Sequence, residues 1–308
     1  MPFFIILNAA SGHREAGDTQ AIISRMMREA GREHHLRLVE NPRDLADIAR
    51  TAVAQANQVG GAVVVAGGDG TINAVANAVL ASACPLGVLP SGTFNYFGRT
   101  HGIPENTQDA VRMLLNASPQ PVQVGLVNDR LFLVNASLGL YPKLLEEREA
   151  WKRQYGRSRL VALWAALVSV VRPRRQLHLE LAKDGQVVHW RTPTLFVGNN
   201  KLQLQQIGMA QAQALDAGFL AAIAPRPVGS LALLWLALRG ALGSLGDADN
   251  VRSFALRELD VTRSAWPSSR IKVAVDGEIV QLHEPLRFQV SPQPLYLLKD
   301  ARLTGGAA

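Results

Sequence analysis

The segment from Val63 to Thr71 constrains the fold of this chain most, because three kinds of local structure follow one another in it. Val63–Ala66 is an apolar run typical of a buried strand, and the sequence Gly-Gly-Asp-Gly-Thr follows at once in Gly67–Thr71. Glycines let a backbone approach a phosphate group, and the start of a helix adds a partial positive charge. The segment therefore predicts a strand, a phosphate-binding turn and a helix over Thr71–Leu80.

Two further turns with polar residues and glycine follow apolar runs in the same way. Asn8–Gly12 comes after the run Phe3–Leu7, and Ser91–Asn95 comes after Leu86–Leu89. Ligands of open α/β sheets bind at the carboxyl ends of the parallel strands. Three such turns at three strand ends therefore predict a nucleotide pocket more strongly than any one of them does.

The wider pattern predicts two domains. Over the first ~120 residues strands alternate with helices, which favours a covered parallel sheet. The remaining elements expected there are strands at 35–39 and 61–66 and helices at 15–30, 42–57 and 108–115. After Pro121, three predicted hairpins turn at Asn128-Asp129, Asp184-Gly185 and Asp276-Gly277, which indicates an antiparallel domain, either a sandwich or a folded sheet. We expect an α/β domain over 1–121 and a β-rich domain over 122–293, with helical insertions near 143–171 and 228–243.

Composition excludes several classes of protein. With 48% hydrophobic and 19% charged residues the chain is not of the disordered type, and a single cysteine, Cys84, excludes an intramolecular disulfide framework. No run reaches the ~18 apolar residues that a spanning helix needs, and the N-terminus shows no basic leader. The histidines lack metal-ligand spacing. We expect a cytoplasmic protein that is soluble or peripheral to a membrane.

Several motifs together resemble the diacylglycerol kinase catalytic domain family, which includes bacterial lipid kinases and the sphingosine and ceramide kinases. The segments that carry the resemblance are Gly67–Asn73, Leu89–Asn95, Gly102–Pro104, Leu215–Leu220 and Val275–Glu278, so that it extends over nearly the whole chain. It implies an N-terminal three-layer α/β domain similar to phosphofructokinase and NAD kinase, and a C-terminal antiparallel β-rich sandwich domain. In such proteins the last strand often returns to the first domain, and here it falls near 294–300.

The resemblance also implies roles for single residues in a kinase that uses ATP and Mg²⁺ and phosphorylates a lipid hydroxyl. Glu278 matches the general base, Asp276 lies beside it, and Asp69 would organise Mg²⁺ or its waters. The implied nucleotide-binding residues are Asn8, Ser11, Gly12, Gly67, Gly68, Asp69, Gly70, Thr71, Asn73, Ser91, Gly92 and Thr93. Spacing alone favours a plain two-residue hairpin turn at Asp276-Gly277, and the catalytic role of Glu278 is what the resemblance implies.

Four positions depart from the family pattern. Ala74, Tyr96, Gln123 and Ala217 stand where many relatives carry an acid. Ala217 replaces the second acid of an Asp-Asp-Gly site that bacterial members use for a structural Mg²⁺, so the sequence leaves the metal ligands unassigned. Two alternatives stay open: a pseudokinase that binds nucleotide or lipid without transfer, and a small-molecule kinase similar to NAD kinase.

The net charge of +7 is concentrated in one segment. Residues 151–175 contain seven basic residues and no acid: Lys152, Arg153, Arg157, Arg159, Arg172, Arg174 and Arg175. They bracket the apolar run Leu160–Val171, which contains Trp164 and reads as an interfacial membrane segment; a core helix with solvated basic ends is the alternative. We therefore expect lipid and an anionic inner membrane surface as partners and no nucleic acid, with a homodimer left open.

Overall fold

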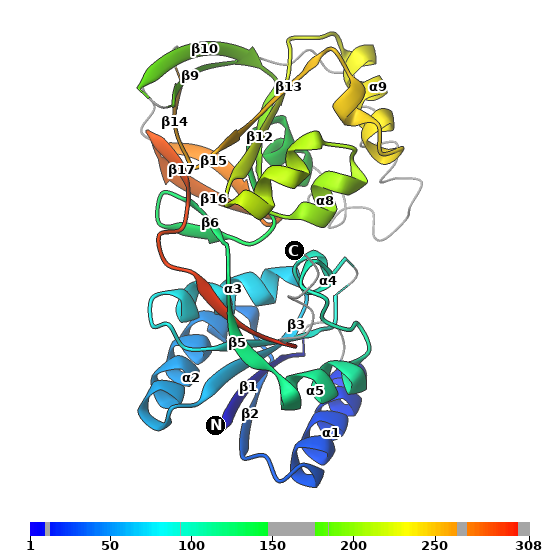
Figure 1. The fold of residues 1–308 in the computed structure, drawn as a ribbon, viewed down its shortest axis with the longest axis vertical. Coiled ribbons are helices and arrows are strands. Elements are labelled where there is room, and N and C mark those ends of the chain that lie inside the picture. Colours follow the sequence, from blue (N-terminus) through cyan, green and yellow to red (C-terminus); the bar gives the residue numbers. More distant parts are fainter. Residues whose placement is uncertain (10–12, 93, 147–175, 184, 264–269, 301–308) are drawn as a thin grey trace. The chain divides into compact units, whose positions relative to one another are not determined.

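The computed structural model describes residues 1–9, 13–92, 94–146, 176–183, 185–263 and 270–300. The chain divides into two units, which are described separately below (Figure 1). The first unit is Met1–Val124 with Ser291–Ala308, and the second is Gly125–Val290. The predicted fold class, an α/β domain followed in sequence by an antiparallel β-rich domain, is confirmed.

The first unit is built on a six-stranded sheet of order β2-β1-β3-β4-β18-β5. Its strands are β1 (Phe3–Asn8), β2 (His34–Val39), β3 (Ala62–Gly67), β4 (Leu86–Pro90), β5 (Ser118–Val122) and β18 (Leu295–Lys299). All neighbours are parallel except β5, which runs antiparallel to β18. The last described strand of the chain thus lies inside the first sheet.

Helices cover both faces of this sheet, which makes three layers. They are α1 (His13–Glu29), α2 (Leu45–Val59), α3 (Asp69–Leu80), α4 (Tyr96–Thr100) and α5 (Thr107–Asn116), with a 3₁₀ turn η1 (Pro42–Asp44) before α2. Figure 1 shows α2 and α3 together on one face and α1 and α5 together on the other, and each pair is in contact. Strands β3 and β4 are buried along their whole length, as expected for central strands of a covered parallel sheet.

The second unit is a sandwich of two six-stranded antiparallel sheets, of order β10-β9-β14-β17-β6-β7 and β13-β12-β11-β8-β15-β16. Side chains that alternate along the strands of both sheets form one buried apolar core, as in Leu179 with Leu181 and Val273 with Val275. The strands are β6 (Gly125–Val127), β7 (Arg130–Phe132), β8 (Asn135–Gly139), β9 (Leu177–Lys183), β10 (Gln186–Thr192), β11 (Thr194–Gly198), β12 (Leu220–Pro225), β13 (Val251–Leu256), β14 (Glu258–Arg263), β15 (Arg270–Val275), β16 (Glu278–His283) and β17 (Leu286–Val290).

Two predicted strands are divided in the structure. The run 122–127 is shared between β5 of the first unit and β6 of the second, and the run 131–136 breaks between β7 and β8. The second break has a long-range cause. The carboxylate of Asp276 accepts hydrogen bonds from the N–H groups of Leu133 and Val134, which would otherwise pair with a neighbouring strand.

The second unit also carries short helices. They are α8 (Lys201–Gln206), η2 (Ala210–Ala217), α9 (Ser230–Ala241) and η3 (Leu245–Asp247), and a small apolar cluster that includes Leu204 and Ala212 packs α8 and η2 on β12. The predicted insertion near 228–243 is α9, whereas most of the one near 143–171 lies outside the described residues. Among the residues that the structure describes, no helix has the length and apolar character needed to cross a membrane.

Candidate active site

The predicted phosphate-binding turn is a sharp junction between β3 and α3. Gly67 ends the strand, and Gly68 is the extended N-cap of the helix, without a side chain to bond the first-turn N–H groups. A Cβ on Gly67 would lie 2.7 Å from the Cβ of Thr71, so only glycine fits there. The N-terminus of α3 therefore offers backbone donors and the positive end of a twelve-residue helix to an anion.

The predicted turn after β4 packs directly against the phosphate-binding turn. The N–H of Ser91 donates to the carbonyl oxygen of Gly67 at 3.0 Å. A Cβ on Gly92 would lie 2.8 Å from the Cα of Gly68, a distance that side chains do not adopt. Asn95, buried and with a φ of +48°, closes the turn by two hydrogen bonds of 2.9 Å to the backbone of Gly92.

Asp69 links the two turns through its carboxylate. Oδ2 accepts from the N–H of Tyr96 and Oδ1 from the N–H of Phe97, each at 3.3 Å, so Asp69 holds the first turn of α4. A carboxylate offers about four acceptor positions, and two long hydrogen bonds leave capacity for a cation or its waters. Asp69 thus fits a Mg²⁺ ion carried on nucleotide phosphates; within the described part of the chain, no group of three His, Cys, Asp or Glu residues is arranged to hold a metal alone.

The predicted turn after β1 contributes one side chain to this assembly. Asn8 Nδ2 donates to Thr71 Oγ1 at 2.7 Å and so connects the end of β1 to α3. Asn73 lies two residues further along α3, where its side-chain and backbone oxygens both accept from Asn77 Nδ2 at 2.9 Å. The structure thus brings together Asn8, Gly67–Thr71, Ser91 and Gly92. The remaining predicted residues, Ser11, Gly12 and Thr93, lie outside the described residues.

Asp276 and Gly277 form the hairpin turn between β15 and β16 in the second unit. Both residues have positive φ, +46° and +88°, as a two-residue type I′ turn requires. The Asp276 carboxylate accepts from the N–H groups of Leu133 at 2.7 Å and of Val134 and Asn135 at 2.9 Å. Asp276 is therefore a positioning residue, which fixes the hairpin to the chain between β7 and β8.

Glu278 is the first residue of β16 and is presented by this hairpin. Its side chain reaches solvent, yet burial of the carboxyl raises its pKa, and the charge of Arg130 acts in the opposite direction. A carboxylate with a raised pKa is a stronger proton acceptor, which suits a general base. Asp276 and Glu278 share one hairpin of the second unit, whereas the residues of the phosphate turn belong to the first.

The segment Leu215–Gly218, which the resemblance compares with an Asp-Asp-Gly motif, contains one acid in this chain. Ala217 ends η2, and the neighbouring Asp216 forms an ion pair with the ammonium group of Lys201. A lysine therefore supplies the positive charge beside the acid that remains.

Two asparagines, Asn95 and Asn135, have structural roles that the sequence pattern did not predict. Asn95 directly follows Gly92-Thr93-Phe94 and has a positive φ. Asparagine tolerates this conformation better than most residues, so its presence in the turn could have indicated the role. Asn135 is buried beside Asp276, where its Nδ2 donates to Gln203 Oε1 at 3.1 Å and its Oδ1 has no partner. The one feature of the sequence that could have indicated this role is that Asn135 is a polar residue within an apolar run.

Comparisons with known proteins agree with this geometry. The family model described as "Diacylglycerol kinase catalytic domain" matches residues 2–127. A Pseudomonas putida protein named "Probable lipid kinase YegS-like" is 32% identical over 260 residues, which cover 81% of each chain. A protein of the same name from Pseudomonas aeruginosa is 30% identical over 277 residues, covering 87% of this chain and 85% of its own.

Solved structures share the fold over the full length. A structure titled as a diacylglycerol kinase from Bacillus anthracis superposes with a TM-score of 0.68 at 17% identity and covers 98% of this chain and 97% of its own. A second structure from the same organism gives a TM-score of 0.74 at 19% identity, with 98% of both chains covered.

Proposed function

Since the chain belongs to the diacylglycerol kinase catalytic domain family, we propose that it transfers the γ-phosphoryl group of ATP to the hydroxyl group of a lipid. One observation carries this proposal: the uncapped N-terminus of α3 lies where the glycines of two turns pack backbone to backbone. Such a turn leaves room for phosphate oxygens and presents N–H donors to them.

On the nucleotide side, the residues of the first unit bind and orient the phosphates. The backbone of Gly68–Thr71 supplies hydrogen-bond donors, and Asn8 holds Thr71 in place. Mg²⁺, when bound with ATP, neutralises charge on the phosphate oxygens, and Asp69 is the carboxylate placed to hold it or its waters. Asp69 also anchors α4 through its hydrogen bonds to Tyr96 and Phe97, so one carboxylate has a structural and a chemical role.

On the acceptor side, Glu278 takes the proton of the lipid hydroxyl. The hydroxyl oxygen forms a bond to the γ-phosphorus, the bond from that phosphorus to the bridging oxygen breaks, and ADP leaves. The raised pKa of Glu278 favours proton uptake, and Asp276 keeps the hairpin that carries it in a fixed conformation. Lipid acceptors reside in membranes, so we extend the proposal to peripheral association with the anionic inner surface through 151–175, which lies outside the described residues.

The test is phosphate transfer from labelled ATP to an extracted lipid mixture, with the products identified by mass spectrometry. Wild type should form a phosphorylated lipid, while Asp69→Asn and Glu278→Gln should each lower the rate at least ~100-fold, the typical contribution of a general base or a charge-stabilising group. Asp129→Asn, an exposed carboxylate in another hairpin turn of the second unit, is the matched control and should transfer at the wild-type rate.

The other outcomes separate the two alternatives. Phosphorylation of NAD and of no lipid would identify a small-molecule kinase. Binding of ATP without transfer to any acceptor would identify a pseudokinase. Equal rates in wild type, Asp69→Asn and Glu278→Gln would refute the assigned roles.

A further inference from the structure

One face of α9 consists of apolar side chains exposed to solvent. Leu234, Trp235, Leu238 and Leu242, the last of these the C-cap, are 37%, 58%, 48% and 71% exposed. Their spacing places them on one stripe of the helix, while Leu236, on the other side, is buried. Within the described part of α9, the other exposed residues are Ala237 and Ala241, so this face carries no polar side chain.

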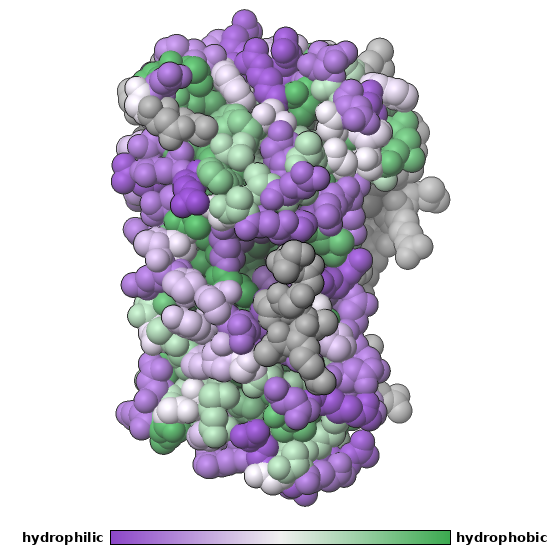
Figure 2. Space-filling model, in the orientation of Figure 1, coloured by the Kyte–Doolittle hydropathy of each residue, from purple (hydrophilic) through white to green (hydrophobic). Residues whose placement is uncertain are grey.

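Solitary exposed apolar residues are common, but a contiguous apolar helix face marks an interaction surface. Figure 2 shows hydrophobic residues at the surface of the second unit where Figure 1 draws α9. The helix is in contact with η3. Within the described residues, the stripe of three leucines and one tryptophan is therefore exposed to solvent.

The size of the stripe argues against a stable protein partner. A helix of twelve residues is about 18 Å long and its face is about 10 Å wide, which gives a surface on the order of 200 Å². Stable protein interfaces bury about 800 Å² on each partner. A lipid bilayer needs no complementary shape, and tryptophan with leucine is the composition of helices that lie in its interface. The helix is also too short to cross a bilayer.

We propose that α9 lies in the interface of a lipid bilayer, with Leu234, Trp235, Leu238 and Leu242 inserted among the acyl chains. This inference rests on the proposed function in one respect, because a lipid acceptor gives the protein a reason to visit a bilayer.

The charges near the helix indicate what drives this contact. Arg239 is the only charged residue of α9 and is held by the carbonyl oxygen of Ser244. In the flanking chain, exposed Arg226 is offset by exposed Asp247 and Asp249. The attraction at α9 is therefore apolar, and its contribution persists at high salt and on neutral lipid, unlike that expected of the basic segment 151–175.

The experiment is flotation of the full-length protein with vesicles of phosphatidylcholine, and separately with vesicles that also contain phosphatidylglycerol, at low and high salt. The test variant combines Leu234→Gln, Leu238→Gln and Leu242→Gln, which keep helix propensity. The control combines Val187→Thr and Val188→Thr on β10, which are 54% and 43% exposed in the same unit. We expect the test variant to lose at least tenfold in partition coefficient on both vesicle types, and the control to stay within twofold.

A second measurement keeps the result independent of folding defects. In a Cys84→Ala background, an environment-sensitive dye on Leu238→Cys should shift its emission to the blue when vesicles are added, and a dye on Val188→Cys should not. The proposal is overturned if wild type binds neither vesicle type, if the test variant binds like wild type, or if the Leu238 dye does not respond. If the wild type were a dimer, the test variant a monomer, and the dye unresponsive to vesicles, the apolar face would bind a second copy of the chain instead of a bilayer.

Transfer of phosphate from ATP to a short-chain, water-soluble diacylglycerol separates this inference from the proposed function. The test variant should phosphorylate this acceptor at the wild-type rate, because α9 carries none of the assigned catalytic residues. Vesicle binding without any transfer would support the bilayer-binding face and refute the kinase proposal. Transfer without vesicle binding would support the kinase proposal and refute the bilayer-binding face.

Discussion

The carboxylate of Asp69 accepts a hydrogen bond from the backbone N–H of Tyr96, a residue that follows it by 27 positions. This contact, with its counterpart at Phe97, ties the phosphate turn to the turn after β4. Asp69 therefore serves the structure of the site as well as its proposed chemistry, and substitutions can separate the two functions.

We predict that Asp69→Ala lowers the free energy of unfolding by about 1–2 kcal/mol, because two N–H groups of α4 lose their acceptor. Asp69→Asn keeps one oxygen in place and should lose about half as much. Urea unfolding measures both values, and titration with ATP should show weaker binding in the order wild type, Asn, Ala. Equal stability of Asp69→Ala and wild type would show that the contact to α4 is not maintained in solution.

The close approach of the two glycine turns gives a second prediction. In Gly92→Ala the new Cβ would meet the Cα of Gly68 at 2.8 Å, a backbone atom that cannot move aside cheaply, and the Oδ1 of Asn95 at 3.0 Å. We expect weaker ATP binding, measured by calorimetry, and a loss of about 1–3 kcal/mol in stability. Gly17→Ala in α1 is the control, because nothing lies within 4 Å of its Cβ and alanine favours a helix; it should bind ATP like wild type and unfold no more easily.

Asp276 is predicted to act through Glu278. In Asp276→Ala three backbone N–H groups of buried residues lose their acceptor, which we expect to cost about 3 kcal/mol of unfolding free energy. Phosphate transfer should fall with it, and Asp276→Asn should recover part of both quantities. Glu278→Gln should lower transfer at least ~100-fold without the loss of stability expected for Asp276→Ala. If Asp276→Ala lowered transfer without any loss of stability, Asp276 would be a catalytic residue and not a positioning one.

These contacts explain which parts of the structure could be predicted from sequence. The buried strand at Val63–Ala66 and the helix after it are set by local pattern and by the glycines between them, so their prediction was confirmed within two residues. The break between β7 and β8 could not be predicted, because its cause is a carboxylate more than 140 residues away in the chain. The bond from Asp69 to α4 and the positive φ of Asn95 are likewise products of tertiary packing.

Glu278 should give the transfer reaction a characteristic pH dependence. Its pKa lies above the ordinary value of a glutamate because burial disfavours the carboxylate, and Arg130 opposes that effect. A general base must be deprotonated, so the rate should rise with pH through this raised pKa. Arg130→Gln removes the opposing charge and should move the midpoint of the rate profile to higher pH. An unchanged midpoint in Arg130→Gln would exclude Glu278 as the group that titrates.

The same shift fixes the sign of a stability effect. The folded state holds the Glu278 proton more tightly than the unfolded chain, so this group's contribution is lost as pH rises from the ordinary glutamate range through the folded pKa. Glu278→Gln should therefore be more stable relative to wild type at neutral pH than at acidic pH. Thermal unfolding at the two pH values measures the difference.

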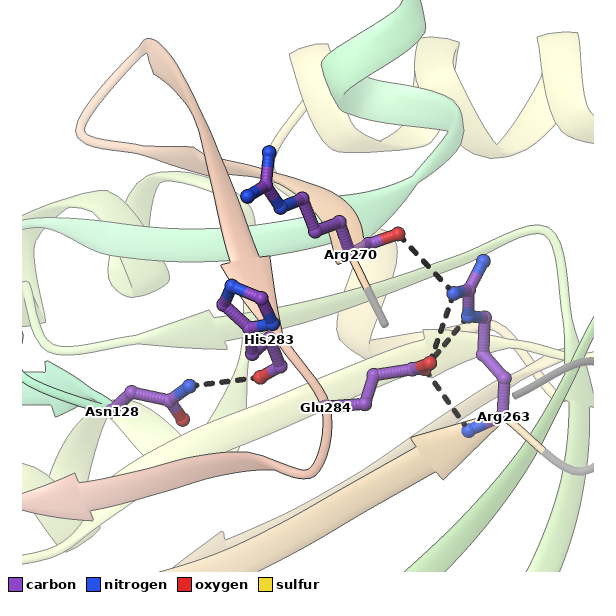
Figure 3. A network of polar contacts seen from close by, with 5 residues as sticks. All are labelled: Asn128, Arg263, Arg270, His283 and Glu284. Atoms are coloured by element: carbon purple, nitrogen blue, oxygen red, sulfur yellow. Dashed lines mark hydrogen bonds and ion pairs between the residues drawn. The ribbon is translucent and has the colours of Figure 1, made fainter. Parts of the chain in front are cut away.

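The ion pair between Arg263 and Glu284 in the second unit has no part in the proposed chemistry. Arg263 Nε and Nη2 donate to the two carboxylate oxygens of Glu284 at 2.7 and 2.9 Å, and Nη2 also donates to the carbonyl oxygen of Arg270 (Figure 3). Close by, Asn128 Nδ2 donates to the carbonyl oxygen of His283. The network connects the end of β14 to the turn before β17, and the Glu284 hydrogen bond raises the pKa of Arg263.

We predict that Glu284→Ala lowers the free energy of unfolding by about 3 kcal/mol, because the carboxylate is 8% exposed and its loss removes the charge that compensates the partly buried Arg263 guanidinium. The matched control is Asp109→Ala, which breaks the exposed pair with Arg112 in α5 and should cost about 0–1 kcal/mol. Urea unfolding gives both values, and ATP binding should be unchanged in each variant. Equal losses in the two variants would mean that the Arg263–Glu284 pair behaves as a solvated surface pair, and that the second unit does not depend on it.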